Sequence, residues 1–191
     1  SLLDIINSLE EPARLYNHPT RFLITDISKG IVNNRQGCEI FGKLLGGTLE
    51  INKEYGIYPL GITTTIKTMK CQNNEEKIIY AGDNAELIID TDDNTMENLR
   101  QGMIISELSR PVPVVTSFTL EMMTLSSNEA PLTIGQVLII HSKLDKSNGK
   151  ITKIHLISQG DKSKKNSPII PKNHFATVDI TLEKPICLEI N

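Results

Sequence analysis

The amino-acid sequence predicts an all-β protein built from two antiparallel β-barrels. Short β-like runs broken by glycine, asparagine and proline follow Pro19, while helical spacing occurs only before Pro12. A segment at 109–113, which contains two prolines, then separates two such series of runs. A chain of 191 residues has room for two domains of this size.

The chain starts with the one convincing helical pattern. Leu2, Leu3, Ile6 and Leu9 fall on one face of a helix, and Pro12 stops the pattern. Residues 1–18 are therefore predicted to form a short helical linker that leads into the first barrel.

The first barrel is predicted to span residues 19–108. Its expected strands are runs of four to nine residues bounded by turn-forming residues, as is typical of barrels and sandwiches. These expected strands cover residues 21–27, 39–45, 56–60, 63–71, 85–90 and 103–106.

The second barrel is predicted to span residues 114–191, because the prolines within 109–113 disfavour both a helix and a central strand at the boundary. The segment 159–171 is rich in lysine, serine, asparagine and proline, which indicates a solvated loop. The expected strands cover residues 116–124, 136–142, 151–158, 175–182 and 186–190.

The charge distribution argues against a self-sufficient nucleic-acid-binding protein. Residues 1–105 contain 15 acids and 10 bases, a net charge of −5, and residues 106–191 contain 8 acids and 10 bases, a net charge of +2. Nucleic-acid-binding domains normally carry a much larger basic excess.

No apolar run approaches the roughly 20 residues of a membrane helix. Three scattered cysteines without a C-x-x-C pair favour the reducing cytoplasm over a disulfide framework or a zinc site.

Motifs that would bind a nucleotide or a metal are all incomplete. Residues 56–63 have the glycine spacing of a P-loop, but Ile62 occupies the lysine position and Pro59 removes an amide donor. The acidic run 90–94 lacks the glycine and the final glutamate of a calcium loop, and the four histidines show no ligand spacing. The sequence thus predicts no catalytic, cofactor-binding or metal-binding residues in this chain.

One hairpin resembles a known family. The stretch Gly37 to Leu49, GCEIFGKLLGGTL, is similar to the hairpin G-x-x-V-x-G-[KR]-x-x-x-G-x-[LI] that opens the second domain of translational GTPases. Further segments match in family order, so the resemblance covers nearly the whole chain. They include PTRFLITD at 19–26, AGDN at 81–84, LRQG at 99–102, PLTIG at 131–135 and KPICLE at 184–189.

The matched pattern assigns two groups of residues. The first group is expected to shape the backbone at bends and turns, and comprises Gly37, Gly42, Lys43, Gly47, Gly82, Asp83, Gly102 and Gly135. The second group, Lys162, Lys164 and Lys165, either contacts ribosomal RNA phosphates or simply solvates a loop.

The members that share the pattern are elongation factor 1-alpha, the release-factor-three GTPases and the ribosome-rescue GTPase that partners Pelota. The segment from Pro131 to His141 is most similar to the rescue branch, which includes a yeast exosome adaptor. The resemblance implies a preceding GTPase domain that holds GTP and Mg²⁺, none being bound by the barrels, and a role in ribosome rescue and mRNA surveillance. Implied partners are the ribosome, a Pelota-like or release-factor-one-like protein, and alternatively the exosome or the Ski complex.

The chain also departs from the family. Leu45 and Gly46 replace the usual acidic residue of the hairpin, which argues against an aminoacyl-end pocket, so no specific aminoacyl-tRNA binding is expected. The family's closing elements, G-R-F-x-x-R and T-x-x-x-G-x-V, do not occur. The second barrel is therefore expected to be trimmed or closed differently. Termination, elongation and decay-adaptor roles stay open as alternatives to rescue.

Overall fold

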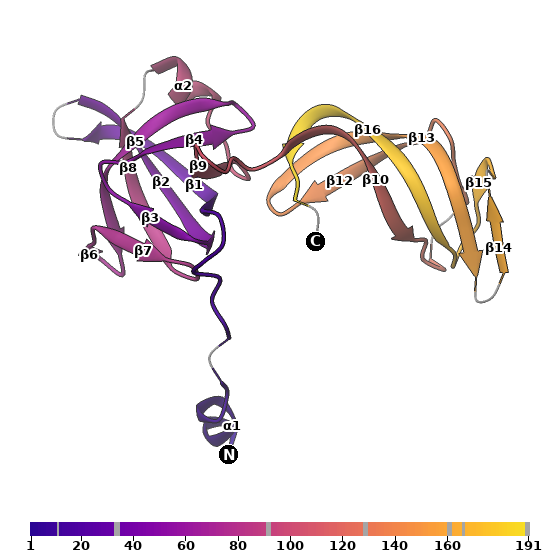
Figure 1. Ribbon diagram of the computed structural model, residues 1–191, viewed down its shortest axis with the longest axis horizontal. Coiled ribbons are helices and arrows are strands. Elements are labelled where there is room, and N and C mark those ends of the chain that lie inside the picture. Colours follow the sequence, from indigo (N-terminus) through magenta and orange to yellow (C-terminus); the bar gives the residue numbers. More distant parts are fainter. Residues whose placement is uncertain are drawn as a thin grey trace. The chain divides into compact units, whose positions relative to one another are not determined.

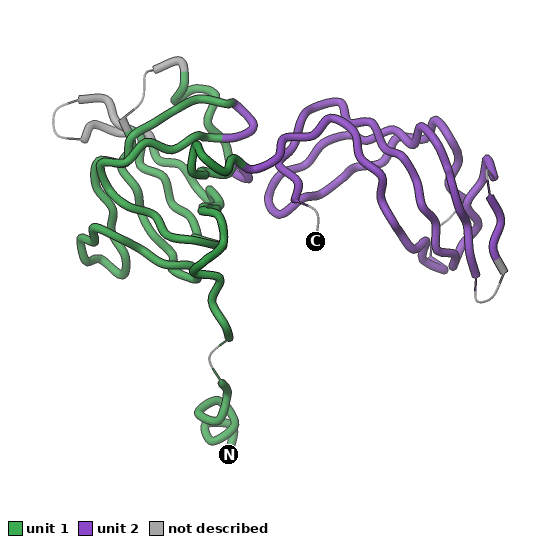
Figure 2. The backbone as a smooth tube through the Cα atoms, viewed as in Figure 1, with its two compact units in different colours: residues 1–57, 61–100, 104–111 green, residues 58–60, 101–103, 112–191 purple. Residues whose placement is uncertain are grey.

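A computed structural model describes residues 1–10, 12–32, 35–90, 93–127, 130–159, 162–165 and 167–189 (Figure 1). Strands dominate this part of the chain, and its helices are α1 (Leu2–Asn7) and α2 (Asp93–Asn98). The predicted all-β class is confirmed. The chain divides into two compact units, 1–57 with 61–100 and 104–111, and 58–60 with 101–103 and 112–191 (Figure 2).

The first unit is a closed barrel. Six of its strands pair in the order β4-β9-β1-β2-β8-β5, and a β4–β5 pairing closes the ring, while β6 extends β5 and β3 pairs with β7. The strands are β1 (Arg21–Val32), β2 (Arg35–Gly46), β3 (Thr48–Glu50), β4 (Glu54–Tyr58), β5 (Ile62–Cys71), β6 (Asn74–Glu75), β7 (Ile78–Tyr80), β8 (Asn84–Asp90) and β9 (Ile104–Glu107).

Alternating apolar side chains fill the barrel. Phe22 and Ile24 of β1 face inward with Ile40 and Leu44 of β2, and all four are fully buried. Strand residues two apart share a face of the sheet, so this period of two places the aliphatic residues inside. With few aromatic residues available, isoleucine, leucine and methionine make up most of the core.

A buried arginine fixes the point where the chain leaves the first unit. Arg21 is only 7% exposed, and its Nη1 donates hydrogen bonds of 2.9 Å to the carbonyl oxygens of Thr20 and Arg110. A buried guanidinium is tolerated only where carbonyl or carboxylate oxygens satisfy its donors. The proline segment at the predicted boundary is therefore held by a specific contact.

The second unit contains a strongly curved sheet with the order β10-β16-β13-β12, in which β14 also pairs with β13 and a separate pair joins β11 to β15. No pairing between β10 and β12 occurs in the described residues, and the sheet stays open there. The strands are β10 (Val114–Met123), β11 (Leu132–Thr133), β12 (Val137–Ser142), β13 (Asp145–Gln159), β14 (Lys162–Lys165), β15 (Ile169–Ile170) and β16 (Phe175–Cys187).

Four expectations about individual elements were wrong. The strands expected separately at 175–182 and 186–190 form one strand, β16. The solvated loop at 159–171 contains β14 and β15, because β13 continues beyond its pairing with β12 and there pairs with β14. Strand β13 begins at Asp145, six residues before the expected start, since residues 145–150 pair with β12. Helix α2 was missed because six residues show no helical period, although Met96 and Leu99 are buried.

Gly42 occupies the tightest place in the first barrel. A Cβ atom there would overlap the Leu23 carbonyl oxygen and the Phe22 ring. The β1–β2 register shifts between Ile24 and Asp26, next to this contact, and the Thr25 hydroxyl donates a 3.1 Å hydrogen bond to the Phe41 carbonyl oxygen. The bulge and the absence of a side chain together let the two strands approach and bend.

We expect Gly42→Val to lower the free energy of unfolding by about 1 to 3 kcal/mol, because the new side chain would push the Phe22 ring out of the core. Chemical denaturation measures the change. The neighbouring Lys43→Val is the matched control, since Lys43 is exposed on the same strand and gains no clash. Equal loss of stability in both variants would contradict the prediction.

Candidate functional site

The turn at Gly82 and Asp83 anchors the linker to the first barrel. The Asp83 carboxylate accepts a 3.0 Å hydrogen bond from the Tyr80 amide through Oδ2 and pairs with Arg14 Nη1 at 3.1 Å through Oδ1. Gly82 adopts φ 102°, and a Cβ there would lie 3.2 Å from Arg14 Nη1. The glycine therefore both makes the turn and leaves room for the arginine.

Further contacts hold the linker to the same side of the barrel. The Gly47 amide donates a 2.9 Å hydrogen bond to the Leu15 carbonyl oxygen. The rings of Tyr16 and Tyr80 pack edge to face, with centroids 6.1 Å apart. Residues 14–16 are thus fastened by an ion pair, a backbone bond and an aromatic contact, and sequence reasoning, which treated 1–18 as a plain linker, missed this fastening.

A polar recess of about 370 Å³ lies beside Gly42. Its charged wall is formed by Lys70 of β5 and Glu86 of β8, paired at 3.0 Å. The full lining consists of Thr25, Phe41, Gly42, Lys70, Gln72, Asn73, Asn84, Ala85 and Glu86.

Glu86, which lines this recess, interacts with a second carboxylate, Glu39 of β2. A hydrogen bond with Glu86 raises the pKa of Glu39, and burial raises it further. The same hydrogen bond and the Lys70 ammonium lower the pKa of Glu86. The two pKa values move apart because two adjacent negative charges repel each other.

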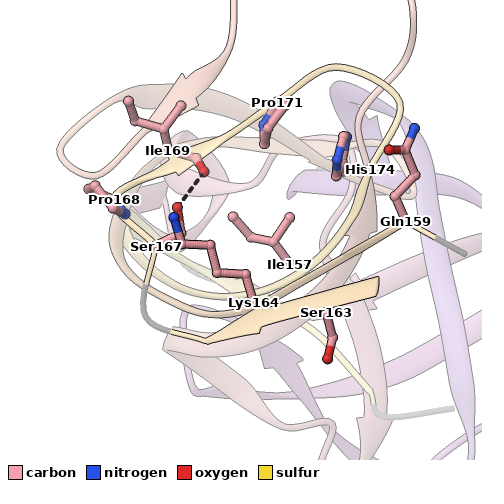
Figure 3. A pocket seen from close by; sticks show the side chains of 9 residues that line it. All are labelled: Ile157, Gln159, Ser163, Lys164, Ser167, Pro168, Ile169, Pro171 and His174. Atoms are coloured by element: carbon pink, nitrogen blue, oxygen red, sulfur yellow. Dashed lines mark hydrogen bonds between the residues drawn. The ribbon is translucent and has the colours of Figure 1, made fainter. Parts of the chain in front are cut away.

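A second pocket lies in the second unit, between the end of β13, β14 and the segment through β15 to His174 (Figure 3). Its volume is about 420 Å³. Ile157 lies at the centre of the view, with Lys164 and Ser163 on the β14 side. The lining residues are Ile157, Gln159, Ser163, Lys164, Ser167, Pro168, Ile169, Pro171 and His174.

Asp179 of β16 joins two neighbouring strands. Its carboxylate accepts a 2.7 Å hydrogen bond from the Thr119 hydroxyl and lies 2.8 Å from His155 Nε2. These two partners, Thr119 first, lower the pKa of Asp179 below its ordinary value of 3.8. The threonine donates to the carboxylate and not to the histidine, so this cluster is a cross-strand tie without the order of a catalytic triad.

The structure scatters the sequence-predicted backbone residues over both units. Gly47, Gly82, Gly102 and Gly135 all have positive φ, between 71° and 102°. Lys43 is exposed on β2, and Gly37 lies in β2 opposite Gly30. Among the described residues of this group, Gly47, Gly82 and Asp83 come together around the linker.

Of the three lysines predicted as a cluster, the structure places one, Lys164, among the residues that line a pocket. Lys164 lines the second pocket, and Lys165 is exposed beside it. Lys162 begins β14, and its side chain lies outside the described residues.

The two incomplete motifs lie in ordinary secondary structure where the structure describes them. Residues 56–63 form the end of β4, a turn at Gly61 and the start of β5. In the acidic run, residues 91–92 lie outside the described part, and Asp93 begins α2. Across the described residues, no three histidine, cysteine, aspartate or glutamate side chains gather as a metal site would require. No helix in the same part is long and apolar enough to cross a membrane.

No family model matches the chain. Over 192 residues it is 27% identical to Protein HBS1 of Drosophila melanogaster, covering 98% of this chain and 28% of that protein. It is 23% identical to elongation factor 1-alpha of Desulfurococcus mucosus, covering 99% of this chain and 42% of that protein. The chain therefore spans less than half the length of these curated relatives.

Solved structures show the same fold. Sup35 complexed with GDP superposes with a TM-score of 0.80 at 19% identity, covering 99% of this chain and 45% of that one. The apo elongation factor SelB of Methanococcus maripaludis gives a TM-score of 0.77 at 13% identity, covering 99% and 40%.

The fold and these similarities define a class: the two barrel domains that form the C-terminal part of translational GTPases. Along nearly its whole length the chain is similar to the corresponding regions of HBS1 and elongation factor 1-alpha.

We expect Arg14→Ala to release residues 13–17 from the barrel, because it removes the ion pair to Asp83. Amide hydrogen exchange in this segment and chymotryptic cleavage after Tyr16 should both become faster. Lys53→Ala serves as the control, since its 3.8 Å pair with Glu50 is exposed and local. Unchanged exchange in Arg14→Ala would show that Tyr16 and Leu15 suffice to hold the linker.

The Asp179 tie should make stability depend on pH in one direction. Because folding lowers the pKa of this carboxylate, its contribution to stability is present above pH 3.8 and is lost as the pH falls through the lower value in the folded state. Denaturant unfolding should therefore show an advantage of the parent protein over Asp179→Asn at pH 6 that disappears at strongly acidic pH.

Thr119→Val is the matched variant for this cluster, since it keeps the carboxylate and removes its first donor. It should reproduce part of the loss at pH 6. An advantage of the parent protein that persists undiminished in strong acid would contradict the assignment.

Proposed function

We propose that the chain is the C-terminal barrel module of a translational GTPase of the ribosome-rescue branch. In this role it docks a tRNA-shaped protein factor, Pelota-like or release-factor-one-like, on the ribosome. The observation that carries the proposal is the similarity to HBS1 along 98% of this chain. GTP and Mg²⁺ would be held by a domain outside these residues.

The electrostatics of the first unit support a protein partner over aminoacyl-tRNA. Residues 1–105 carry a net charge of −5, and two of their carboxylates, Glu39 and Glu86, interact on the barrel. A tRNA acceptor arm is a dense line of phosphates that such a surface repels. Protein interfaces instead tolerate mixed charge with a polar rim.

Three other roles share the fold. A release-factor-three-type module would dock a release factor in termination, and an elongation-factor module would bind aminoacyl-tRNA. An RNA-decay adaptor of the exosome or Ski complex would work away from the ribosome. The 23% identity to elongation factor 1-alpha over 99% of the chain gives the elongation reading its support. Ribosome co-sedimentation of the parent protein separates the adaptor role from the others.

We expect the chain to bind a Pelota-like protein and to show no specific affinity for aminoacyl-tRNA. Calorimetry with purified Pelota-like protein, release-factor-one-like protein and charged tRNA measures the three affinities side by side. Stronger binding to the release factor moves the chain to the termination branch. Tight, salt-sensitive binding to charged tRNA alone would overturn the proposal in favour of elongation.

A further inference from the structure

The pocket between β13, β14 and β15 combines an apolar floor with a basic rim. Ile157 is 5% exposed and continues into the core cluster with Ile170 and Ala176. Pro168, Ile169 and Pro171 form the wall, and Ile169 remains 45% exposed. A half-exposed isoleucine beside two prolines is apolar surface that a ligand side chain can cover.

The rim is basic and carries no carboxylate among the described lining residues. Lys164 lines the pocket and is exposed, and it forms no ion pair within the described part of the chain. Lys165 and Lys172 are exposed nearby in sequence. The segment 159–174 contains four lysines and one aspartate, a net charge of +3 in a chain whose total is −3.

The wall of the pocket is fixed before any ligand arrives. The Thr124 hydroxyl, 2% exposed, donates a 2.7 Å hydrogen bond to the Pro171 carbonyl oxygen and accepts one of 3.0 Å from the His174 amide. The Ser167 hydroxyl donates to the Ile169 carbonyl oxygen at 3.0 Å, as Figure 3 shows. Pairing of β15 with β11 holds the other end. A wall that is already ordered lowers the entropic cost of binding.

The strand at the rim has an unpaired edge. In the described sheet β14 pairs with β13 alone, so its outer backbone donors and acceptors are available. Lysines on such an edge oppose pairing with another basic strand and favour an acidic one. An extended peptide can add to an open edge through main-chain hydrogen bonds while its side chains enter adjacent pockets.

We propose that this pocket binds an extended segment of a protein partner in which an aliphatic side chain is flanked by acidic residues. The aliphatic side chain covers Ile157 and Ile169, and the flanking carboxylates pair with Lys164 and its neighbours. This site goes beyond the proposed function, because it lies wholly in the second unit and needs neither GTP nor the ribosome to bind.

A phosphate backbone fits the pocket less well than such a peptide. No phenylalanine, tyrosine or tryptophan lies among the described lining residues, and bases of single-stranded RNA usually stack on such rings. Phosphate contacts would also leave the isoleucine and proline floor uncovered. The sequence analysis left open that these lysines contact RNA phosphates. The test below therefore includes RNA binding as the competing outcome.

The test uses the whole chain with methyl-labelled isoleucines and three short probes followed by NMR. The probes are N-acetyl-Glu-Leu-Glu-amide, the charge-reversed N-acetyl-Lys-Leu-Lys-amide and the apolar-deleted N-acetyl-Glu-Ser-Glu-amide. The first probe should give saturable shifts of the Ile157 and Ile169 methyl groups at concentrations up to about 10 mM, and the other two should bind at least about fivefold more weakly. A short A-form RNA duplex is titrated in the same way.

Two variants and a matched control assign the binding to this pocket. Lys164→Glu reverses the charge of the lysine that lines the pocket, and Ile169→Ser removes exposed apolar wall. Each should weaken binding of the first probe at least about fivefold. Lys150→Glu reverses an exposed lysine elsewhere on β13 and should leave binding unchanged. Equal melting temperatures show that the variants stay folded.

Three outcomes overturn the proposal. The first is the absence of shifts at the Ile157 and Ile169 methyl groups. The second is equal binding of the acidic and basic leucine probes. The third is stronger, Lys164-dependent perturbation of the same methyl groups by the RNA duplex, which would assign the lysines to phosphate. Failure of Pelota binding leaves all three readings of this test intact, so the two proposals fail separately.

Discussion

The close approach of β1 and β2 at Gly42 is the constraint on which the first unit depends. A closed ring of six strands must bend each strand, and bending brings backbones nearer than a side chain allows. The register shift near Thr25 and the absence of a side chain at Gly42 together allow this close approach. Phe22, packed against the same glycine, then closes the core.

Closing the ring also determines where the surface features lie. Gly42 lines the polar recess, so the bend that shapes the barrel opens the hollow beside Lys70 and Glu86. The turn at Gly82 and Asp83 follows β7 and receives Arg14 of the linker. Residues that look purely architectural in the sequence thus set both the recess and the attachment of the linker.

Local sequence pattern predicted the all-β class and the first barrel well, because burial on one face imposes a period of two on each strand. The sequence pattern failed where a segment becomes a strand only because it pairs with a neighbouring strand. Strand β14 is KSKK, whose composition alone favours a loop, and it is extended because β13 runs far enough to pair with it. The contacts of Arg14 with Asp83 and of Thr119 with Asp179 join residues 69 and 60 positions apart, so no local pattern reveals them. The pocket at Ile157 escaped prediction for the same reason, since its walls come from three separate strands and the segments between them.

The lysines along β14 also govern how copies of this chain behave toward one another. Charge on an open edge keeps identical edges apart only over the distance that dissolved ions leave unscreened, about 10 Å in 0.1 M salt and about 3 Å in 1 M. The outer backbone groups of that edge are unpaired within the described sheet, and salt does not change their capacity to form hydrogen bonds. Concentrated salt therefore screens the repulsion between the lysines but leaves the unpaired backbone groups of β14 able to form hydrogen bonds. Self-association of this protein should therefore increase with salt. An assembly held by ion pairs would instead weaken with salt.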